Sequence, residues 1–263
     1  MLGGLQSIMT QQNTERINKY LAAAGICSRR QADELIAQGK VLINGQVAQN
    51  GMKVCPGDKV ELIGGKEQKA KKQIKGSADK IVLAFYKPIG VTCTEKDKFA
   101  DKKVLDYVKT KTRVTYAGRL DKESEGLMIL TNDGELIQRM MKGAEKHEKE
   151  YVVKVDKELT AEFIENMSKG VYLKELDRTT RACPVIMEGK YTFRIVLTQG
   201  MNRQIRRMCE TFGYKVKALK RVRIMSIELG KMKTGESRVL TKAECAQLYR
   251  AVGMQIPREF TEM

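Results

Sequence analysis

The sequence has little of what metal and redox sites are made from. It contains one histidine, His147, and six cysteines that are scattered along 263 residues without a CxxC pair. Because zinc and iron sites draw their ligands from closely spaced cysteines and histidines, we expect no metal. The same scatter predicts reduced thiols, as in a cytoplasmic protein.

Long apolar runs are also missing. No stretch approaches the roughly 20 apolar residues of a membrane-spanning helix, and residues 1–10 lack the cationic start of a secretory signal. Residues 1–12 predict a disordered leader, and residues 255–263 predict a loose tail. Because no coiled-coil pattern or large exposed apolar stripe is present, we expect a monomer with no membrane contact.

Positive charge is what the chain has in excess. Lys and Arg number 49 against 32 Asp and Glu, which gives a formal net charge of +17. An excess of this size says little about fold, but it favours polyanionic partners, above all nucleic acid. The length suits one large domain or two unequal domains.

The first module, residues 13–63, predicts two helices followed by a small sheet. Apolar residues at helical spacing form the first helix, and Ser28 with Gln31 forms a capping box that begins the second. Asn44-Gly45 between two apolar runs is a strong hairpin signal, and residues 59–63 predict the last strand.

This module carries the segments RINKYLAAAGICSRRQADELI, GKVLINGQ and VCPGDKVEL. In this order they resemble the S4 RNA-binding domain over the whole module. Near the helix junction, where the start of the second helix also favours phosphate, lie the candidate RNA contacts Arg16, Lys19, Arg29 and Arg30. An ordinary solvated charged face is the alternative, and the layout with the net charge favours RNA.

Residues 64–80 predict a flexible basic linker, because they hold six Lys against one Glu and one Asp. Residues 81–254 predict the larger domain. Its expected strands are 81–86, 113–117, 127–130, 151–155, 179–187, 191–198, 215–219 and 223–229, and its expected helices are 104–108, 135–141, 161–168, 203–212 and 243–251. Because strands come in runs, we expect an α+β fold whose mainly antiparallel or mixed sheet is flanked by helices.

Residues 118–133, GRLDKESEGLMILTND, are the most informative segment. A Gly-bounded loop presents Asp121 beside Arg119, and a buried strand follows at 127–130. A lone Asp in a Gly-rich loop is usually only a turn residue. Catalytic groups are also carried on such loops, and the rest of the chain favours that role for Asp121.

Three further segments belong beside this loop. Lys87-Pro88 ends the first strand of the larger domain, and Tyr151 opens a strand after a charged pair. A third segment runs from a strand into a helix, with Asn202 as the expected N-cap. In that helix an apolar stripe faces the core, and Arg203, Arg206 and Arg207 are left off the core near its start.

The segments KPIGVTCT, GRLDKESEGLMILTND, KEYVV, QGMNRQIRRM and LKRVRI occur in this order. Together they resemble the pseudouridine synthases of the RsuA branch, over roughly residues 13–250. The segments HEKEYVV and TQGMNRQIRRMCETFGY are most similar to the RluF type, which acts on 23S ribosomal RNA. The resemblance implies the pseudouridine synthase fold and a cofactor-free isomerisation in bacteria, in which the N1–C1′ bond of a uridine is replaced by a C5–C1′ bond.

The same resemblance implies roles for individual residues. Asp121 would be the nucleophile, Tyr151 would stack on the flipped uracil and assist removal of the C5 proton, and Arg206 would pair with Asp121. RNA contacts are expected at Arg119, Lys87, Arg203 and Arg207. Glu123 and Glu125 place two more negative charges near Asp121, for which the sequence offers no account.

The expected partner is a structured hairpin of 23S RNA, free or in the assembling large subunit. Two alternatives stay open at this point. One keeps the chemistry but moves it to 16S or transfer RNA. The other is a non-catalytic RNA-binding or ribosome-assembly factor, which needs the S4 module but has no need of Asp121, Tyr151 and Arg206 together.

Overall fold

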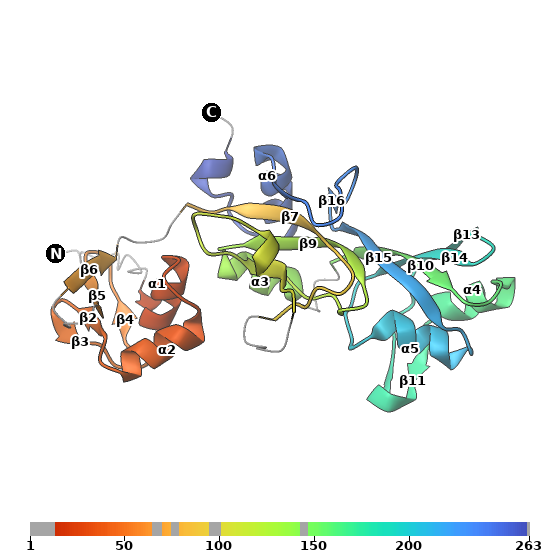
Figure 1. Ribbon diagram of the computed structural model, residues 1–263, viewed down its shortest axis with the longest axis horizontal. Coiled ribbons are helices and arrows are strands. Elements are labelled where there is room, and N and C mark those ends of the chain that lie inside the picture. The colour runs from red at the N-terminus through yellow and green to blue at the C-terminus, as the bar shows by residue number, and fades with distance from the viewer. Residues whose placement is uncertain (1–13, 65–69, 75–78, 95–100, 143–146, 262–263) are drawn as a thin grey trace, which may run out of the picture. The chain divides into compact units, whose positions relative to one another are not determined.

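The computed structural model describes residues 14–64, 70–74, 79–94, 101–142 and 147–261. The chain divides into two compact units, Met1–Asp79 and Lys80–Met263 (Figure 1). The predicted leader, 1–12, lies outside the described residues. Within the described part of the chain, no helix is both long and apolar enough to cross a membrane.

The smaller unit packs two helices against short strands. Its elements are β1 (Glu15–Arg16), α1 (Ile17–Ala23), α2 (Arg29–Ala37), β2 (Val41–Ile43), β3 (Gln46–Val47), β4 (Lys53–Val54), β5 (Val60–Gly64) and β6 (Ala70–Ile74). The sheet order is β3-β2-β5-β6, and β1 pairs separately with β4. The predicted capping box of Ser28 and Gln31 is confirmed, and Asn44 and Gly45 both have the positive φ of the predicted hairpin turn.

The expectation of a flexible linker over residues 64–80 is wrong in its middle. Residues 70–74 form β6, which pairs antiparallel with β5 from Val60 to Gly64. Ile74 is buried in the core of the smaller unit. One buried apolar residue and a free sheet edge are therefore enough to add a strand to this segment.

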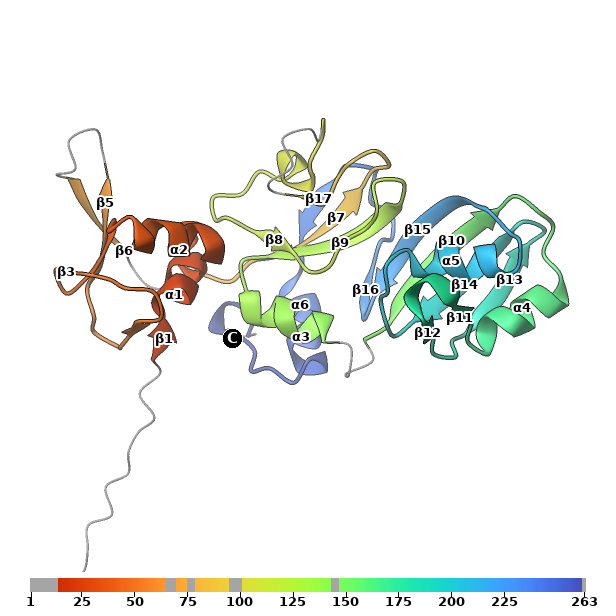
Figure 2. The same ribbon diagram turned by 90° about the horizontal axis from the view of Figure 1, so that it is seen from below.

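The larger unit is an α+β domain, as predicted (Figure 2). Its strands are β7 (Val82–Lys87), β8 (Thr115–Tyr116), β9 (Glu125–Thr131), β10 (Lys149–Val155), β11 (Tyr172–Leu173), β12 (Arg178–Thr179), β13 (Val185–Gly189), β14 (Thr192–Leu197), β15 (Val216–Ile224), β16 (Ile227–Glu228) and β17 (Ser237–Val239). Its helices are η1 (Val104–Tyr107), α3 (Gly134–Met141), α4 (Ala161–Ser168), η3 (Lys174–Leu176), α5 (Gln204–Thr211), α6 (Lys242–Ala251) and η4 (Arg258–Phe260).

One mixed sheet organises this unit. The order β13-β14-β10-β15-β9-β7-β17 is antiparallel except where β15 runs parallel to β9. Along β7 and β9 successive residues alternate between two apolar clusters, one with α4 and α5 and the other with α3 and α6. Both faces of the sheet are therefore covered, which explains why all six residues of β7 are buried.

Four expected elements differ from the structure. The predicted strand 179–187 is interrupted: β12 and β13 are separate, and Pro184 stands between them. The strands expected at 215–219 and 223–229 form the single long β15, followed by the short β16. β17 was not predicted, since three residues carry little pattern. The expected loose tail is wrong at 258–260, because Phe260 is buried against Tyr249.

Candidate active site

Asp121 lies in the loop between β8 and β9, and β9 is an inner strand of the larger unit's sheet. Its carbonyl oxygen accepts a hydrogen bond from the Ser124 backbone N–H, which closes a tight turn. Leu120 is buried beside it, and the backbone N–H of Gly90 donates to the carbonyl of Lys122. A turn anchored at three points therefore holds the half-exposed Asp121 carboxylate.

Lys87, at the end of β7, holds this turn in place. Its ammonium group donates to the carbonyl oxygens of Ser124 at 2.6 Å, Pro88 at 2.8 Å and Lys122 at 3.5 Å. The side chain is fully buried, and this burial lowers the pKa of Lys87 to about 8. The prediction that Lys87 contacts RNA is therefore wrong for this structure, because its three donors are used inside the protein.

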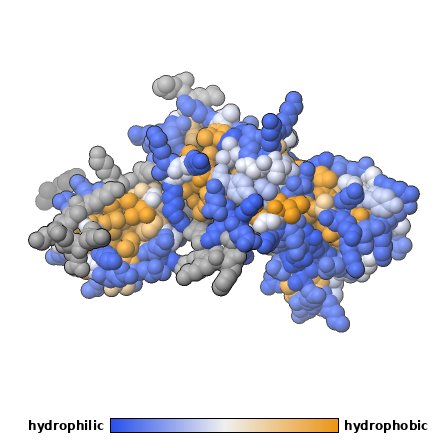
Figure 3. Space-filling model, in the orientation of Figure 1, coloured by the Kyte–Doolittle hydropathy of each residue, from blue (hydrophilic) through white to orange (hydrophobic). Residues whose placement is uncertain are grey.

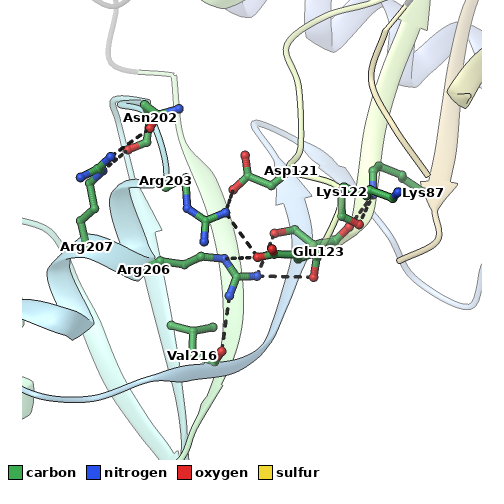
Figure 4. Close-up of polar contacts among 10 residues, drawn as sticks. Lys87, Asp121, Lys122, Glu123, Asn202, Arg203, Arg206, Arg207 and Val216 are labelled. Atoms are coloured by element: carbon green, nitrogen blue, oxygen red, sulfur yellow. Dashed lines mark hydrogen bonds and ion pairs between the residues drawn. The ribbon is translucent and has the colours of Figure 1, made fainter. Parts of the chain in front are cut away.

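Arg203, and not Arg206, is the arginine beside Asp121 (Figure 4). Its Nη1 lies 3.9 Å from Asp121 Oδ2 and 3.3 Å from Glu123 Oε2. Arg206 is 92% buried, and its guanidinium reaches Glu123, Ser124 and the Val216 carbonyl. The implied pairing of Arg206 with Asp121 is thus corrected, as is the expectation that Arg206 lies off the core. A long buried guanidinium can serve as a structural cross-link where short sequence patterns predict a surface residue.

The start of α5 also differs from the prediction. Arg203 itself occupies the N-cap position in the left-handed conformation, with φ of 52°, and Asn202 does not cap the helix. Instead Asn202 accepts hydrogen bonds from Arg207 through its backbone and side-chain oxygens. A left-handed non-glycine residue costs free energy and is held in place by its surroundings. Here that conformation belongs to the residue whose side chain faces Asp121.

The two glutamates near Asp121 now have partners. Glu123 faces Arg203 and Arg206, as described above. Glu125 at the start of β9 accepts a hydrogen bond from the Tyr86 hydroxyl at 2.8 Å and lies 3.6 Å from Lys220. Each glutamate therefore has a cation nearby, and Glu123 shares Arg203 with Asp121.

Tyr151 lies on β10, directly opposite Arg221 of β15. Tyr151 is 9% exposed and Arg221 is 2% exposed, and Arg221 donates from Nε to the Leu127 carbonyl at 2.7 Å. Lys149, two residues before Tyr151, is partly buried, and its burial together with the nearby Arg221 lowers its pKa. The strands thus place an aromatic ring among cations.

A cleft of about 840 Å³ brings these residues together. Asp121, Tyr151, Arg119, Arg203 and Arg206 all line it. Of its charged lining residues in the described part of the chain, nine are Lys or Arg and one, Asp121, is a carboxylate. Such a cleft suits a polyanionic ligand, to which it presents the Asp121 carboxylate.

Known proteins similar in sequence to this chain act on RNA, which agrees with the basic cleft. Residues 81–211 match the family model of RNA pseudouridylate synthases, and residues 15–60 match the S4 domain. The chain is 44% identical over 244 residues to the dual-specificity RNA pseudouridine synthase RluF of Escherichia coli, covering 93% of this chain and 81% of that protein. The chain belongs to the RNA pseudouridylate synthase family.

Other relatives of this synthase support the assignment. It is 36% identical to the ribosomal large subunit pseudouridine synthase B of Bacillus subtilis, over 89% of this chain and 95% of that protein. A solved structure of a pseudouridylate synthase shares the fold, with a TM-score of 0.64 at 24% identity, over 89% of this chain and 99% of the other. The protein is therefore an enzyme that isomerises uridine in RNA, and the non-catalytic alternative is set aside.

The described part of the synthase holds no group of three or more His, Cys, Asp or Glu side chains that could bind a metal ion. The six cysteines are free thiols, five of them buried. Cys93 lies near the site, where it accepts a hydrogen bond from the Leu120 backbone N–H.

Some residues of the synthase's cleft were not singled out from the sequence. Arg178 and Arg181 come from the segment between α4 and β13, and Gln199 follows β14. Arg221 belongs to the segment LKRVRI, which was noted only for its resemblance. No local sequence pattern identifies these residues as part of the site, because strand pairing brings them to the cleft from distant parts of the chain.

The four candidate RNA contacts of the smaller unit are surface residues. The side chains of Arg16, Lys19, Arg29 and Arg30 are all exposed. Lys19 also pairs with Glu15 at 3.0 Å, one turn earlier. On the face shown in Figure 3, hydrophilic side chains cover most of the larger unit.

Proposed function

We propose that this synthase converts a specific uridine of 23S ribosomal RNA to pseudouridine, with Asp121 as the nucleophile and without a cofactor. The observation that carries the proposal is the cleft in which, among the described residues, Asp121 is the one carboxylate beside nine Lys and Arg. The Bacillus relative, which is named for the large ribosomal subunit, supports the choice of RNA.

Asp121 is suited to nucleophilic catalysis by its position. Lys87 fixes the backbone that follows Asp121, through the carbonyl oxygens of Lys122 and Ser124. The carboxylate is therefore already positioned before the reaction begins. Arg203 Nη1, 3.9 Å from Asp121 Oδ2, places a positive charge beside the oxygen that would act as the nucleophile. Arg206 supports the same turn from the other side through Glu123 and Ser124.

Tyr151 provides the surface for the base. A uridine in a folded RNA must leave its stack before its C1′ and C5 atoms can be reached, and an aromatic ring compensates for part of the lost stacking. Tyr151 lies in the same cleft as Asp121 and belongs to a central strand, which keeps its ring in one orientation.

The reaction exchanges one bond to the ribose for another. The N1–C1′ bond breaks, the uracil turns, and a C5–C1′ bond forms; C5 loses its hydrogen to a base and N1 gains one. No electrons are lost or gained overall, so the chain's own carboxylate, tyrosine and arginines can supply every group the step requires. Tyr151 is placed to assist removal of the C5 proton.

RNA affinity comes from positive charge on both units. In the smaller unit Arg16, Lys19, Arg29 and Arg30 are exposed, and in the larger unit Arg119 is exposed at the cleft. Contacts of this kind release counterions from the RNA, so that binding weakens steeply as salt is raised. We infer a structured hairpin of the large-subunit RNA as substrate.

A second RNA substrate is the other candidate. The Escherichia coli relative is named a dual-specificity enzyme, and this chain covers 81% of it. The same chemistry on a transfer RNA or on 16S RNA would need no change in the site, because a flipped uridine presents the same atoms in each.

Pseudouridine mapping tests the proposal. Ribosomal and transfer RNA from cells that lack the enzyme are incubated with wild-type protein or with Asp121→Ala, treated with carbodiimide and copied by primer extension. A new stop in 23S RNA with the wild-type protein alone is the expected result. New stops in both 23S and transfer RNA would favour the dual candidate, and stops in neither would contradict the proposed substrate.

A further inference from the structure

A short excursion from the main sheet forms part of the cleft and has no role in the chemistry described above. It comprises residues 172–181, between α4 and β13, and contains β11, η3 and β12. β11 and β12 pair with each other and not with the nine-stranded sheet. In both ribbon views the excursion lies beside α5 (Figures 1 and 2).

The base of the excursion is firmly closed. Val171 and Thr180 exchange two hydrogen bonds at 2.9 Å, one through the buried Thr180 hydroxyl. Gly170 has a φ of +96°, and a Cβ added there would lie 2.5 Å from the Thr180 carbonyl oxygen. The two ends of the excursion therefore approach as closely as backbone allows, which fixes its direction.

The tip is braced as well. The Tyr172 hydroxyl donates to Asp177, which has a left-handed backbone with φ of 47°. Glu175 forms an ion pair with Arg207 of α5, and Arg207 is itself bound to Asn202. Arg207, which was expected to contact RNA, thus acts here as a positioning residue for the excursion.

The braced segment presents two arginines to the cleft. Arg178 and Arg181 are exposed and line the same cleft as Asp121, and Arg181 donates to the Thr198 carbonyl at 3.2 Å. Within the described residues no carboxylate forms an ion pair with Arg178, whereas Arg203, Arg206 and Arg207 each have a glutamate nearby. The charge of Arg178 is therefore available to an external anion.

We propose that the excursion of residues 172–181 is a backbone clamp, in which Arg178 and Arg181 bind phosphates of the nucleotides that flank the target uridine. This inference rests on the proposed function for its ligand, an RNA phosphodiester backbone. Guanidinium groups suit phosphate because they offer paired donors in one plane. A contact to phosphate holds the RNA without selecting a sequence, so the clamp raises affinity for the substrate.

The test compares three full-length proteins on a 23S RNA transcript. Arg178→Gln/Arg181→Gln removes the clamp's charge, and Arg178→Lys/Arg181→Lys keeps it. Arg250→Gln/Arg258→Gln removes the same charge from exposed arginines that do not line the cleft. Binding is measured between about 50 and 200 mM KCl, and KM and kcat are measured on the same RNA.

The Gln/Gln clamp variant should lower the slope of log Kd against log salt by roughly 1.4 to 1.8, which corresponds to two lost phosphate contacts. Its KM should rise roughly a hundredfold with kcat nearly unchanged, because each of the two charged hydrogen bonds is worth a factor of about 10 or more. The Lys/Lys variant should recover most of the wild-type slope, and the distal control should keep wild-type KM and show a smaller change of slope.

A clamp variant with the slope and KM of the distal control would overturn the inference, and so would a loss confined to kcat. Near-ultraviolet circular dichroism of each variant identifies misfolding. Glu175→Gln is a second test, because it removes only the ion pair with Arg207. It should raise KM by a smaller factor than the Gln/Gln clamp variant does. If wild-type protein binds the RNA but forms no pseudouridine, the proposed substrate fails, while the salt slopes still decide whether the clamp exists.

Discussion

At the scale of single residues, two cations with different surroundings define the environment of Asp121. Lys87 is buried and holds the turn through three carbonyl oxygens, so its ammonium group binds the backbone. Arg203 is partly exposed and lies 3.9 Å from the carboxylate, so its charge is available to Asp121 and to a bound substrate. Arg206 is buried between α5 and the turn and links the two.

These placements predict different effects for the two arginines. Arg203→Gln should lower kcat roughly tenfold or more, which is about 1.4 kcal/mol of transition-state stabilisation, and leave the melting temperature unchanged. Arg206→Gln should destabilise the fold by about 1 to 3 kcal/mol, since it leaves buried acceptors without a donor. Thermal unfolding and single-turnover rates on the same RNA separate these effects, and the reverse pattern would show that Arg206 serves Asp121.

The loop of Asp121 and the arginines at the start of α5 could be predicted from the sequence, because their residue types and order follow a specific pattern. Which arginine faces Asp121 could not, since that depends on the left-handed turn at Arg203 and on the burial of Arg206. The burial of Lys87 was missed for the same reason. Two of its carbonyl partners belong to a loop 35 and 37 residues away in sequence, so no local sequence pattern indicates them.

At the scale of elements, the parallel contact between β9 and β15 brings the Asp121 loop to the strand that carries Arg221. Gly126 pairs with Arg221 and has a φ of +118°. A Cβ at residue 126 would lie 2.3 Å from the Arg221 carbonyl oxygen and 2.5 Å from its nitrogen. Only glycine allows the two strands to approach this closely.

Gly126→Ala should therefore destabilise the protein by roughly 2 to 5 kcal/mol, through both the strained φ and the backbone clash. Gly189→Ala is the matched control, because a Cβ there meets nothing within 4 Å, and its effect should stay within about 0.5 kcal/mol. Urea unfolding of both variants provides the measurement. Equal stability of the two variants would contradict the close approach of β9 and β15.

Most elements could be predicted because apolar periodicity and capping residues are local signals. α4 begins and ends at the predicted residues, and Ser28 and Gln31 cap α2 as expected. The pairing of β6 with β5 and the separation of β12 from β13 could not be predicted in this way, because a strand's partner is decided by tertiary contacts.

At the scale of the whole molecule, the exposed arginines of α2 and the cleft with Asp121 belong to two separate compact units. The net charge of +17 draws the chain to RNA, and the smaller unit contributes exposed arginines at the start of α2. The larger unit contains the cleft with Asp121. Charge changes in the first unit should therefore alter binding and not the isomerisation itself.

Arg29→Gln/Arg30→Gln tests this division. The double variant should bind 23S RNA more weakly with a shallower salt dependence, by about 0.7 to 0.9 in slope per lost contact. Its rate at saturating enzyme should equal that of wild type. Filter binding across salt concentrations and single-turnover rates give both quantities, and a reduced rate at saturation would show that the smaller unit also takes part in catalysis.

The most direct test of the central claim compares the two neighbouring acidic residues of one turn. Tritium release from uridine labelled at C5, in a 23S RNA transcript, is followed with wild type, Asp121→Asn and Glu123→Gln. The account predicts that Asp121→Asn binds the RNA but releases no tritium, whereas Glu123→Gln keeps measurable release because Glu123 only balances Arg203 and Arg206. Release by Asp121→Asn at the wild-type rate would contradict the assignment of Asp121 as the nucleophile.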